Sequence, residues 1–262
     1  QVVFSDTVHD VGHQGKYLHH ITTFSCVAQP SGIATGSPLF KSEMPDTCGT
    51  LESAWAPGSI AFVAPEGSGI PIGNGIVWWA SEYHYYNPSL EPFNDSSGTK
   101  IVITKNIRAH DVGMLSMSRQ ATLRPMTIGP LDHTVTYGPD FCDLNCGGEA
   151  SWTEEVNVLG VVYHQHLASF SNDIQVIRAT DAKPTGENLG SIASQGRMNF
   201  NHQRLLTPRI TKLMPGDLLA LFCTWKTMHA PIDTEFGAGT NQEMCISFIQ
   251  YSPRQPLFGC GS

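Results

Sequence analysis

The sequence predicts an all-β protein built from two sandwich or jelly-roll domains. The first observation is that apolar residues occur in short alternating runs that are rich in β-branched and aromatic residues. The second is that clusters of Gly, Pro, Asn and Asp separate these runs, as turns do. The third is that no stretch of 3.6-residue periodicity extends beyond about three turns. Together these patterns favour strands packed face to face.

The expected strands are separated at one point by a linker-like segment. Residues 86–98 hold two prolines and a cluster of Asn, Asp, Ser and Gly between two strand-like runs. We therefore expect an N-terminal domain of residues 1–92 and a C-terminal domain of residues 93–262. The clearest expected strands, in chain order, are residues 1–5, 100–104, 158–167, 173–178, 217–223 and 244–251.

Composition excludes several classes of protein. The chain has 262 residues, of which 40% are hydrophobic and 15% charged, so it reads as globular and not disordered. Its net charge of -8 argues against a nucleic-acid partner, because phosphate binding requires clustered Lys and Arg. No apolar run approaches the roughly 20 residues of a membrane-spanning helix. Motifs of nucleotide-binding proteins, serine hydrolases and zinc proteases are absent from the sequence.

The cysteines indicate an oxidising compartment. Seven are present, and their spacing is not that of a zinc ribbon, so disulfides in a secreted or secretory-pathway protein are expected. Asn94 begins an Asn-Asp-Ser sequon in a turn-rich stretch and is the expected glycosylation site. No signal peptide is present, and Gln1 lies inside strand-like sequence, so we expect a processing boundary or a fragment end there.

Five histidines and one methionine stand out as candidate metal ligands, three in each half of the chain. Imidazole suits copper, zinc, iron and nickel, whereas a thioether narrows the choice toward copper, because soft sulfur favours Cu(I). Two copper ions, one in each domain, are therefore expected, and they imply redox chemistry. The first group is His19, His20 and His84, and the second is His164, His166 and Met244.

Each candidate also has an ordinary structural interpretation. His164 and His166 would share one face of a strand, about 6–7 Å apart, but they could equally be two surface histidines. His19 and His20 would point to opposite faces of a regular strand, so both can bind one metal only at a bend, at a strand end or through different ring nitrogens. A single His among aromatic residues, such as His84, is usually a packing residue.

Met244 taken alone also has a packing interpretation, because methionine commonly fills gaps in a core. Its flank, residues 242–245, follows the glycine-rich turn of residues 237–240, which is an unusual place for a purely structural methionine.

Six motifs, taken together, make the chain resemble the copper type II, ascorbate-dependent monooxygenases over nearly its whole length. They occur in the family's order, which makes a chance similarity improbable. They are His19-His20 followed by Cys26, residues 54–58, residues 82–88, the pair His164 and His166, residues 215–223, and residues 239–245.

The resemblance implies a role for each ligand group. His19, His20 and His84 would hold the copper that passes electrons. The second group, His164 and His166 with the Met of the last motif, would hold the copper where dioxygen binds and a substrate C–H bond is hydroxylated. Ascorbate would be the electron donor, and the substrate would be a small molecule. The family fold, two β-sandwich domains, agrees with the division expected above.

The resemblance also implies three disulfides. The pairs would be Cys26 with Cys48, Cys142 with Cys260, and Cys223 with Cys245. Cys146 is then left over, either free or joining a second chain in a covalent or non-covalent oligomer. The family's first strands are missing before Gln1, so the chain is either a fragment of a longer polypeptide or a pared-down member.

The substrate is less well specified, because several positions depart from the family. Peptide-amidating members carry an Arg where this chain has Val162, and Asn and Tyr where it has Ile246 and Phe248. The absence of an Arg–carboxylate contact, worth roughly 1.5–3 kcal/mol, argues against peptide amidation. The dopamine-type members resemble this chain more closely in residues 82–88. Those members carry an acidic residue where this chain has Ser116, so amine recognition is also in question. A non-catalytic secreted copper-binding or matrix protein is the competing interpretation.

Overall fold

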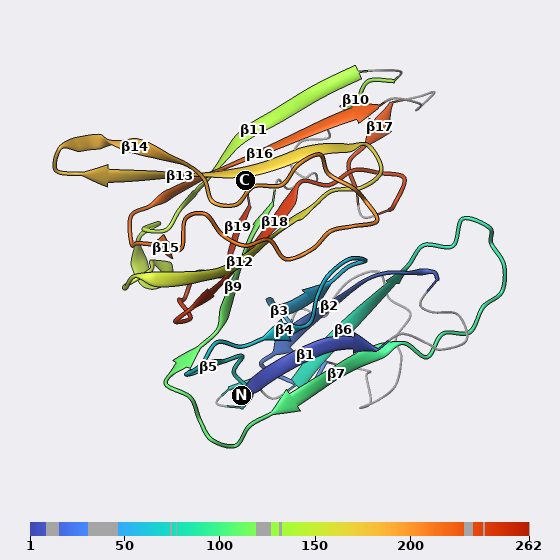
Figure 1. Cartoon of the computed structure of the whole chain (residues 1–262), viewed down its shortest axis with the longest axis horizontal. Coiled ribbons are helices and arrows are strands. Elements are labelled where there is room, and N and C mark those ends of the chain that lie inside the picture. Colours follow the sequence, from blue (N-terminus) through green and yellow to red (C-terminus); the bar gives the residue numbers. More distant parts are fainter. Residues whose placement is uncertain are drawn as a thin grey trace. The chain divides into compact units, whose positions relative to one another are not determined.

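The structure, a computed structural model, contains two compact units, Gln1–Val112 and Gly113–Ser262. Figure 1 traces both along the chain. The described residues are 1–8, 16–30, 47–73, 75–76, 78–118, 127–130, 133–227, 233–237 and 239–261.

The first unit consists of two three-stranded antiparallel sheets and a short parallel pair. The sheet orders are β4-β1-β7, β3-β2-β6 and β5-β8. Its strands are β1 (Val2–Val8), β2 (Leu18–Cys26), β3 (Thr50–Trp55), β4 (Phe62–Val63), β5 (Ser68–Gly69), β6 (Trp78–Tyr85), β7 (Gly98–Ile103) and β8 (His110–Asp111).

Alternation of apolar and polar residues explains the strands of this unit. Ile21 on β2 and Leu51 on β3 are buried on neighbouring strands. Val2 on β1 is also buried and pairs with the buried Ile70, which follows β5. Each contributes one apolar side chain to the core, whereas the residues between them are more exposed. The buried set is small, so the two sheets enclose a modest core.

The second unit contains two larger sheets and a short pair. The sheet orders are β11-β16-β13-β14, β15-β12-β18-β9-β19 and β10-β17, and among the described strands of this unit only β19 runs parallel to its neighbour. Its strands are β9 (Gly113–Ser118), β10 (Thr127–Ile128), β11 (His133–Asp143), β12 (Val156–His164), β13 (Ser169–Thr180), β14 (Lys183–Ser191), β15 (Lys212–Leu213), β16 (Leu218–Thr227), β17 (Thr234–Glu235), β18 (Ile246–Ser252) and β19 (Gly259–Gly261).

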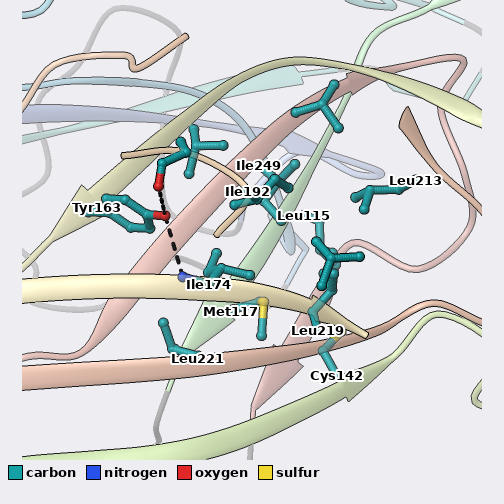
Figure 2. Close-up of a cluster of buried hydrophobic side chains, with 14 of the residues drawn as sticks. Leu115, Met117, Cys142, Tyr163, Ile174, Ile192, Leu213, Leu219, Leu221 and Ile249 are labelled. Carbon is teal, nitrogen blue, oxygen red and sulfur yellow. Dashed lines mark hydrogen bonds between the residues drawn. The ribbon is translucent and has the colours of Figure 1, made fainter. Parts of the chain in front are cut away.

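The two large sheets of the second unit share one hydrophobic core, part of which Figure 2 shows. Leu219 and Ile174 enter it from one sheet, and Leu115 and Ile249 enter it from the other, all fully buried. Tyr163 crosses between them, donating a hydrogen bond to the Ala193 carbonyl at 3.3 Å. This arrangement is a β-sandwich, in which alternate residues of facing strands meet in the middle.

The all-β prediction is confirmed. Within the described residues the only helical element is the single turn η1 (Gly148–Ala150). The expected strands at 100–104, 173–178, 217–223 and 244–251 coincide with β7, β13, β16 and β18 to within a few residues at their ends. None of the described helices is long and apolar enough to span a bilayer.

The expected domain boundary after residue 92 falls inside the first unit. Strand β7 follows the linker-like residues 86–97 and pairs with β1 from Val2 to Val8. Because that pairing extends along β1, residues 93–112 belong to the first compact unit.

Candidate metal centres

The three histidines of the first group meet on two neighbouring strands. His20 on β2 lies directly opposite His84 on β6, whereas Leu18 pairs with Tyr85. The register therefore shifts between Leu18 and His20, which leaves His19 as the extra residue of a β-bulge. A bulge interrupts the alternation of side chains, so two adjacent residues can serve the same site. The bulge therefore explains how the adjacent residues His19 and His20 can both face His84.

The cluster is compact enough to hold one metal ion. The ligating atoms of His19, His20 and His84 all lie within 4.8 Å of one another. The Nδ1 atoms of His19 and His20 are 3.0 Å apart, a spacing compatible with a metal about 2 Å from each nitrogen. His19 is buried and the other two are half-buried. Three imidazoles in this arrangement form a suitable site for copper.

The surroundings of His84 favour its metal-binding form. Burial lowers the pKa of His84, and the nearby Glu82 carboxylate opposes that shift. A lowered pKa keeps the imidazole neutral, and a neutral ring nitrogen can donate its lone pair to a metal. Glu82 is in turn held by the Thr22 hydroxyl, which donates to its carboxylate at 3.0 Å.

His164 and His166 lie at the end of β12 and not along its length. His164 is the last residue of the strand, and His166 follows in the turn. Their ring centroids are 5.1 Å apart with nearly perpendicular planes. The expected strand of residues 158–167 is therefore three residues too long at its end, but the two rings still lie close together.

Hydrogen bonds at Nδ1 set the tautomer of both rings. His166 Nδ1 lies 2.9 Å from the Gln242 carbonyl, which can only accept, so this nitrogen carries the proton. His164 Nδ1 lies 2.7 Å from Gln203 Oε1. The Gln203 amide nitrogen donates to the carbonyls of Gln165 and Phe200, which fixes the oxygen toward His164. Both rings therefore offer Nε2 to a metal.

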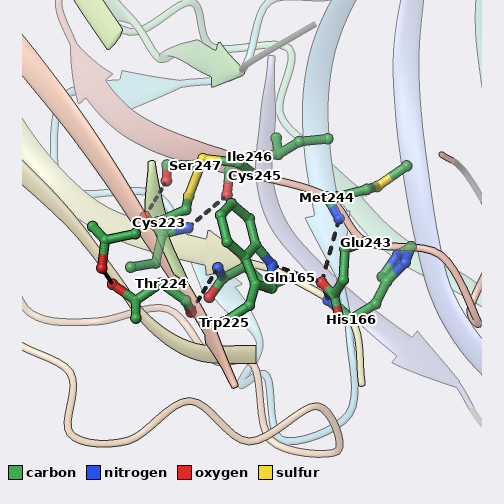
Figure 3. The surroundings of a disulfide bond; sticks show 12 residues. Gln165, His166, Cys223, Thr224, Trp225, Glu243, Met244, Cys245, Ile246 and Ser247 are labelled. Atoms are coloured by element: carbon green, nitrogen blue, oxygen red, sulfur yellow. Dashed lines mark hydrogen bonds between the residues drawn. A yellow bond between two sulfur atoms is a disulfide. The ribbon is translucent and has the colours of Figure 1, made fainter. Parts of the chain in front are cut away.

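Met244 belongs to the same end of the second unit. It is half-buried and lies between the buried Glu243 and Cys245, just before β18 begins. Figure 3 shows its thioether and the ring of His166 projecting away from the neighbouring disulfide. Imidazole nitrogens and a thioether are borderline and soft donors, the kinds of ligand that copper prefers.

The Glu243 carboxylate lies behind these ligands. It is 1% exposed and accepts hydrogen bonds from the backbone N–H groups of His166 and Ala168, from the Trp225 indole, and from the Met244 N–H. Burial raises the pKa of Glu243 to about 7, while these donors act in the opposite direction. The Glu243 carboxylate therefore contacts the backbone of two candidate ligands, His166 and Met244.

Three disulfides are present, and they are the pairs that the resemblance implies. Cys223–Cys245 joins β16 to the residue after Met244, as Figure 3 shows. The others are Cys26–Cys48 and Cys142–Cys260. The remaining cysteine, Cys146, is exposed and forms no disulfide. Asn94, the expected glycosylation site, is also exposed.

Gln203, Gln242 and Glu243 were not identified from the sequence as parts of the site. The available signal for Glu243 was its place directly before Met244 and Cys245, two residues that the sequence had singled out. The sequence contains no signal for Gln203, which lies far from His164 along the chain. It contains none for Gln242 either, because that residue acts through its backbone carbonyl.

Comparison with known proteins is consistent with the geometry of both centres. The family model for the N-terminal domain of copper type II ascorbate-dependent monooxygenases matches residues 6–92, and that for the C-terminal domain matches residues 110–262. DBH-like monooxygenase protein 1 of Gallus gallus is 30% identical over 94% of this chain and 41% of its own length. Dopamine beta-hydroxylase of Bos taurus is 27% identical over 94% of this chain and 40% of its own.

The chain thus spans about two-fifths of the length of the relatives that it matches. MOXD1 homolog 1 of Drosophila melanogaster, for example, is 26% identical over 97% of this chain and 39% of its own length. Among solved structures, a subviral particle of infectious bursal disease virus VP2 aligns over 97% of this chain and 56% of its own, with 9% identity and a TM-score of 0.28. A TM-score that low supports no conclusion about the fold.

Proposed function

The chain belongs to the copper type II ascorbate-dependent monooxygenase family, and we propose that it is a secreted enzyme that hydroxylates a substrate C–H bond with dioxygen and ascorbate. His19, His20 and His84 would hold the copper that transfers electrons. His164, His166 and Met244 would hold the copper at which the substrate reacts. The observation that carries this proposal is the presence of one compact imidazole cluster in each unit.

The two clusters would have different roles, because they offer different donor atoms to copper. Bound copper supplies one-electron redox chemistry and the activation of dioxygen. The Met244 thioether is a soft donor and would favour Cu(I), the state that reacts with dioxygen. Gln203 and the Gln242 carbonyl orient the two imidazoles through Nδ1. The first cluster has three imidazoles and no thioether, which suits a site that accepts and passes electrons.

The strands beside His164 bear on the substrate. His164 pairs with Ile246 across the sheet, and the next position on the same face pairs Val162 with Phe248 and then with Ser116. An apolar Val162 cannot hold a carboxylate as an Arg would. This surface therefore favours a small substrate of the kind that dopamine-type members take over a glycine-extended peptide.

A secreted location agrees with the cysteine chemistry. Three disulfides persist in oxidising compartments and are rare in the reducing cytosol. The exposed sequon at Asn94 would be accessible to glycosylation in the secretory pathway.

One observation favours a second candidate function. Cys146 is an exposed thiol, and a secreted protein can use such a group for covalent assembly. A copper-binding structural or matrix protein on the same scaffold would then need no substrate site.

The test is ascorbate-dependent oxygen uptake by the copper-loaded chain, with a panel of phenethylamines and glycine-extended peptides as substrates. We expect uptake coupled to a hydroxylated product with a member of the amine set and none with the peptides. Two bound coppers without coupled uptake on either set would instead favour the structural function.

A further inference from the structure

Glu243 is a buried carboxylate whose described partners are all neutral N–H donors. It accepts from the backbone N–H of Ala168 at 2.5 Å and from that of His166 at 2.9 Å. The indole of Trp225 donates at 2.9 Å, and the Met244 N–H at 3.4 Å. With only 1% of the residue exposed, solvent contributes little to its hydrogen bonding. A carboxylate this buried is costly unless its hydrogen bonds are made, so these contacts determine its position.

The four donors come from separate parts of the second unit. His166 and Ala168 belong to the turn after β12, where the strand ladder has already ended. In that turn the carboxylate takes the place that a neighbouring strand would occupy. Met244 follows Glu243 directly, two residues before β18 begins. One side chain therefore fixes the backbone of two candidate ligands at the same time.

The carboxylate is itself anchored from two directions. Trp225 is fully buried on β16, in the sheet opposite the one that contains β12. The Glu243 backbone is also held, since its N–H donates to Glu235 and its carbonyl accepts from Gly237, at 2.8 and 3.0 Å. A carboxylate held at both ends can impose its geometry on the turn and does not merely follow it.

We propose that Glu243 is a positioning residue for the second copper. Its carboxylate holds the backbone of His166 and Met244 in the arrangement that directs the imidazole and the thioether to one ion. The inference rests on the proposed copper ligation, but its test reads copper binding and not turnover. Failure of this inference and failure of the hydroxylase proposal therefore give different results.

The role requires a carboxylate and not merely a polar side chain. Oε1 accepts from Ala168, and Oε2 accepts from the other three groups. The substitution Glu243→Gln places an amide NH₂ against at least one N–H in either orientation. Because the side-chain volume is nearly unchanged, the donor clash is the main difference between the two proteins.

Asp217 provides a matched control in the same unit. It is also 1% exposed and is held by two contacts of 2.7 Å from Arg178 and one of 2.9 Å from the Met214 N–H. These partners include none of the proposed ligands. The substitution Asp217→Asn thus perturbs a buried carboxylate and its stability without touching the metal site.

The experiment measures Cu(I) affinity by competition with a chelator, together with the Cu(II) EPR spectrum, on the folded fraction of each copper-loaded variant. We expect Glu243→Gln to bind the second copper at least about tenfold more weakly, with an altered spectrum, and to retain the first. Asp217→Asn should unfold at a lower temperature and bind both coppers with wild-type affinity. Glu243→Asp, which keeps the charge but is one methylene shorter, should give an intermediate affinity.

Two results would overturn the proposal. One is a folded Glu243→Gln protein with wild-type affinity and spectrum at the second site. The other is an equal loss of the second copper in Asp217→Asn, which would make the effect one of general stability. If Glu243→Gln does not fold, Glu243→Asp decides, and wild-type affinity in that variant rejects the role.

Discussion

The two histidine clusters bring their imidazoles together by different structural means. In the first unit, three imidazoles come from two paired strands, and a bulge at His19 brings them together. In the second, His164 ends a strand and His166 lies beyond it, so the ladder alone does not fix both rings. Gln203, the Gln242 carbonyl and the Glu243 carboxylate supply the missing restraints.

The difference extends to the packing beneath each cluster. The second unit has a contiguous core shared by two large sheets, and its polar contacts are buried at the edge of that core. Buried hydrogen bonds are costly to break, because the group left behind loses its partner away from water. The comparison teaches that the first site depends on strand pairing and the second on a network of buried side chains.

The largest test of this comparison is removal of a ligand from the second site. His164→Ala should lose the copper of the second unit and with it the proposed hydroxylation activity, because two remaining donors hold an ion poorly. The first unit forms its cluster independently and should keep its copper. Metal analysis should therefore give one copper per chain in place of two. His110→Ala, an exposed histidine of the first unit, is the control and should keep both. Loss of both coppers, or of neither, would contradict the assignment of two separate copper sites.

Disulfide removal gives a comparison matched in loop length. Cys26–Cys48 and Cys223–Cys245 both join residues 22 apart in sequence. Replacing either pair with alanine should cost about 2–5 kcal/mol of stability, measured by denaturant unfolding. Only the second pair should also weaken binding of the second copper, because Cys245 follows Met244 directly. The contrast between the sites fails if the Cys26–Cys48 variant weakens that copper as much.

Gln203→Leu should have a smaller effect, confined to the second site. The change removes the acceptor for His164 Nδ1, and loss of such a contact typically lowers metal affinity about 10–100-fold, or about 1.4–2.8 kcal/mol. Copper titration on the folded protein measures it. Gln175→Leu removes another glutamine of the unit, one whose side chain contacts Asp173 and Asn188, and should leave the affinity unchanged.

Much of this organisation follows from sequence pattern, but the parts that distinguish the two sites do not. Alternation predicts the strands of the second sandwich, since in β13 the buried residues Asn172, Ile174 and Val176 lie two positions apart. It predicts that His19 and His20 point apart, and the structure departs from this because the bulge adds one residue to β2. Strand periodicity contains no information about such an insertion, because it depends on pairing with β6.

The same limit applies to the second site. The His164 and His166 pair is visible in the sequence, but the contact of His164 with Gln203 joins residues 39 positions apart and depends on tertiary folding. The Glu243 carboxylate likewise reaches His166 across 77 positions. A single sequence can therefore reveal candidate ligands, whereas the groups that orient them become visible only once the chain is folded.

The smallest predicted effect comes from removing a polar contact near the first site. It tests whether strand pairing alone assembles that site. Thr22→Val keeps the shape of the side chain but removes the hydroxyl that donates to Glu82 at 3.0 Å. The loss should cost about 0.5–1.5 kcal/mol of stability, the usual net value of one hydrogen bond. Because strand pairing and not this contact assembles His20 and His84, affinity for the first copper should change by less than about threefold, or roughly 0.6 kcal/mol. Copper titration beside Gln203→Leu makes the comparison direct. If Thr22→Val weakens the first copper as much as Gln203→Leu weakens the second, both sites depend on their polar neighbours, and the distinction drawn between them is wrong.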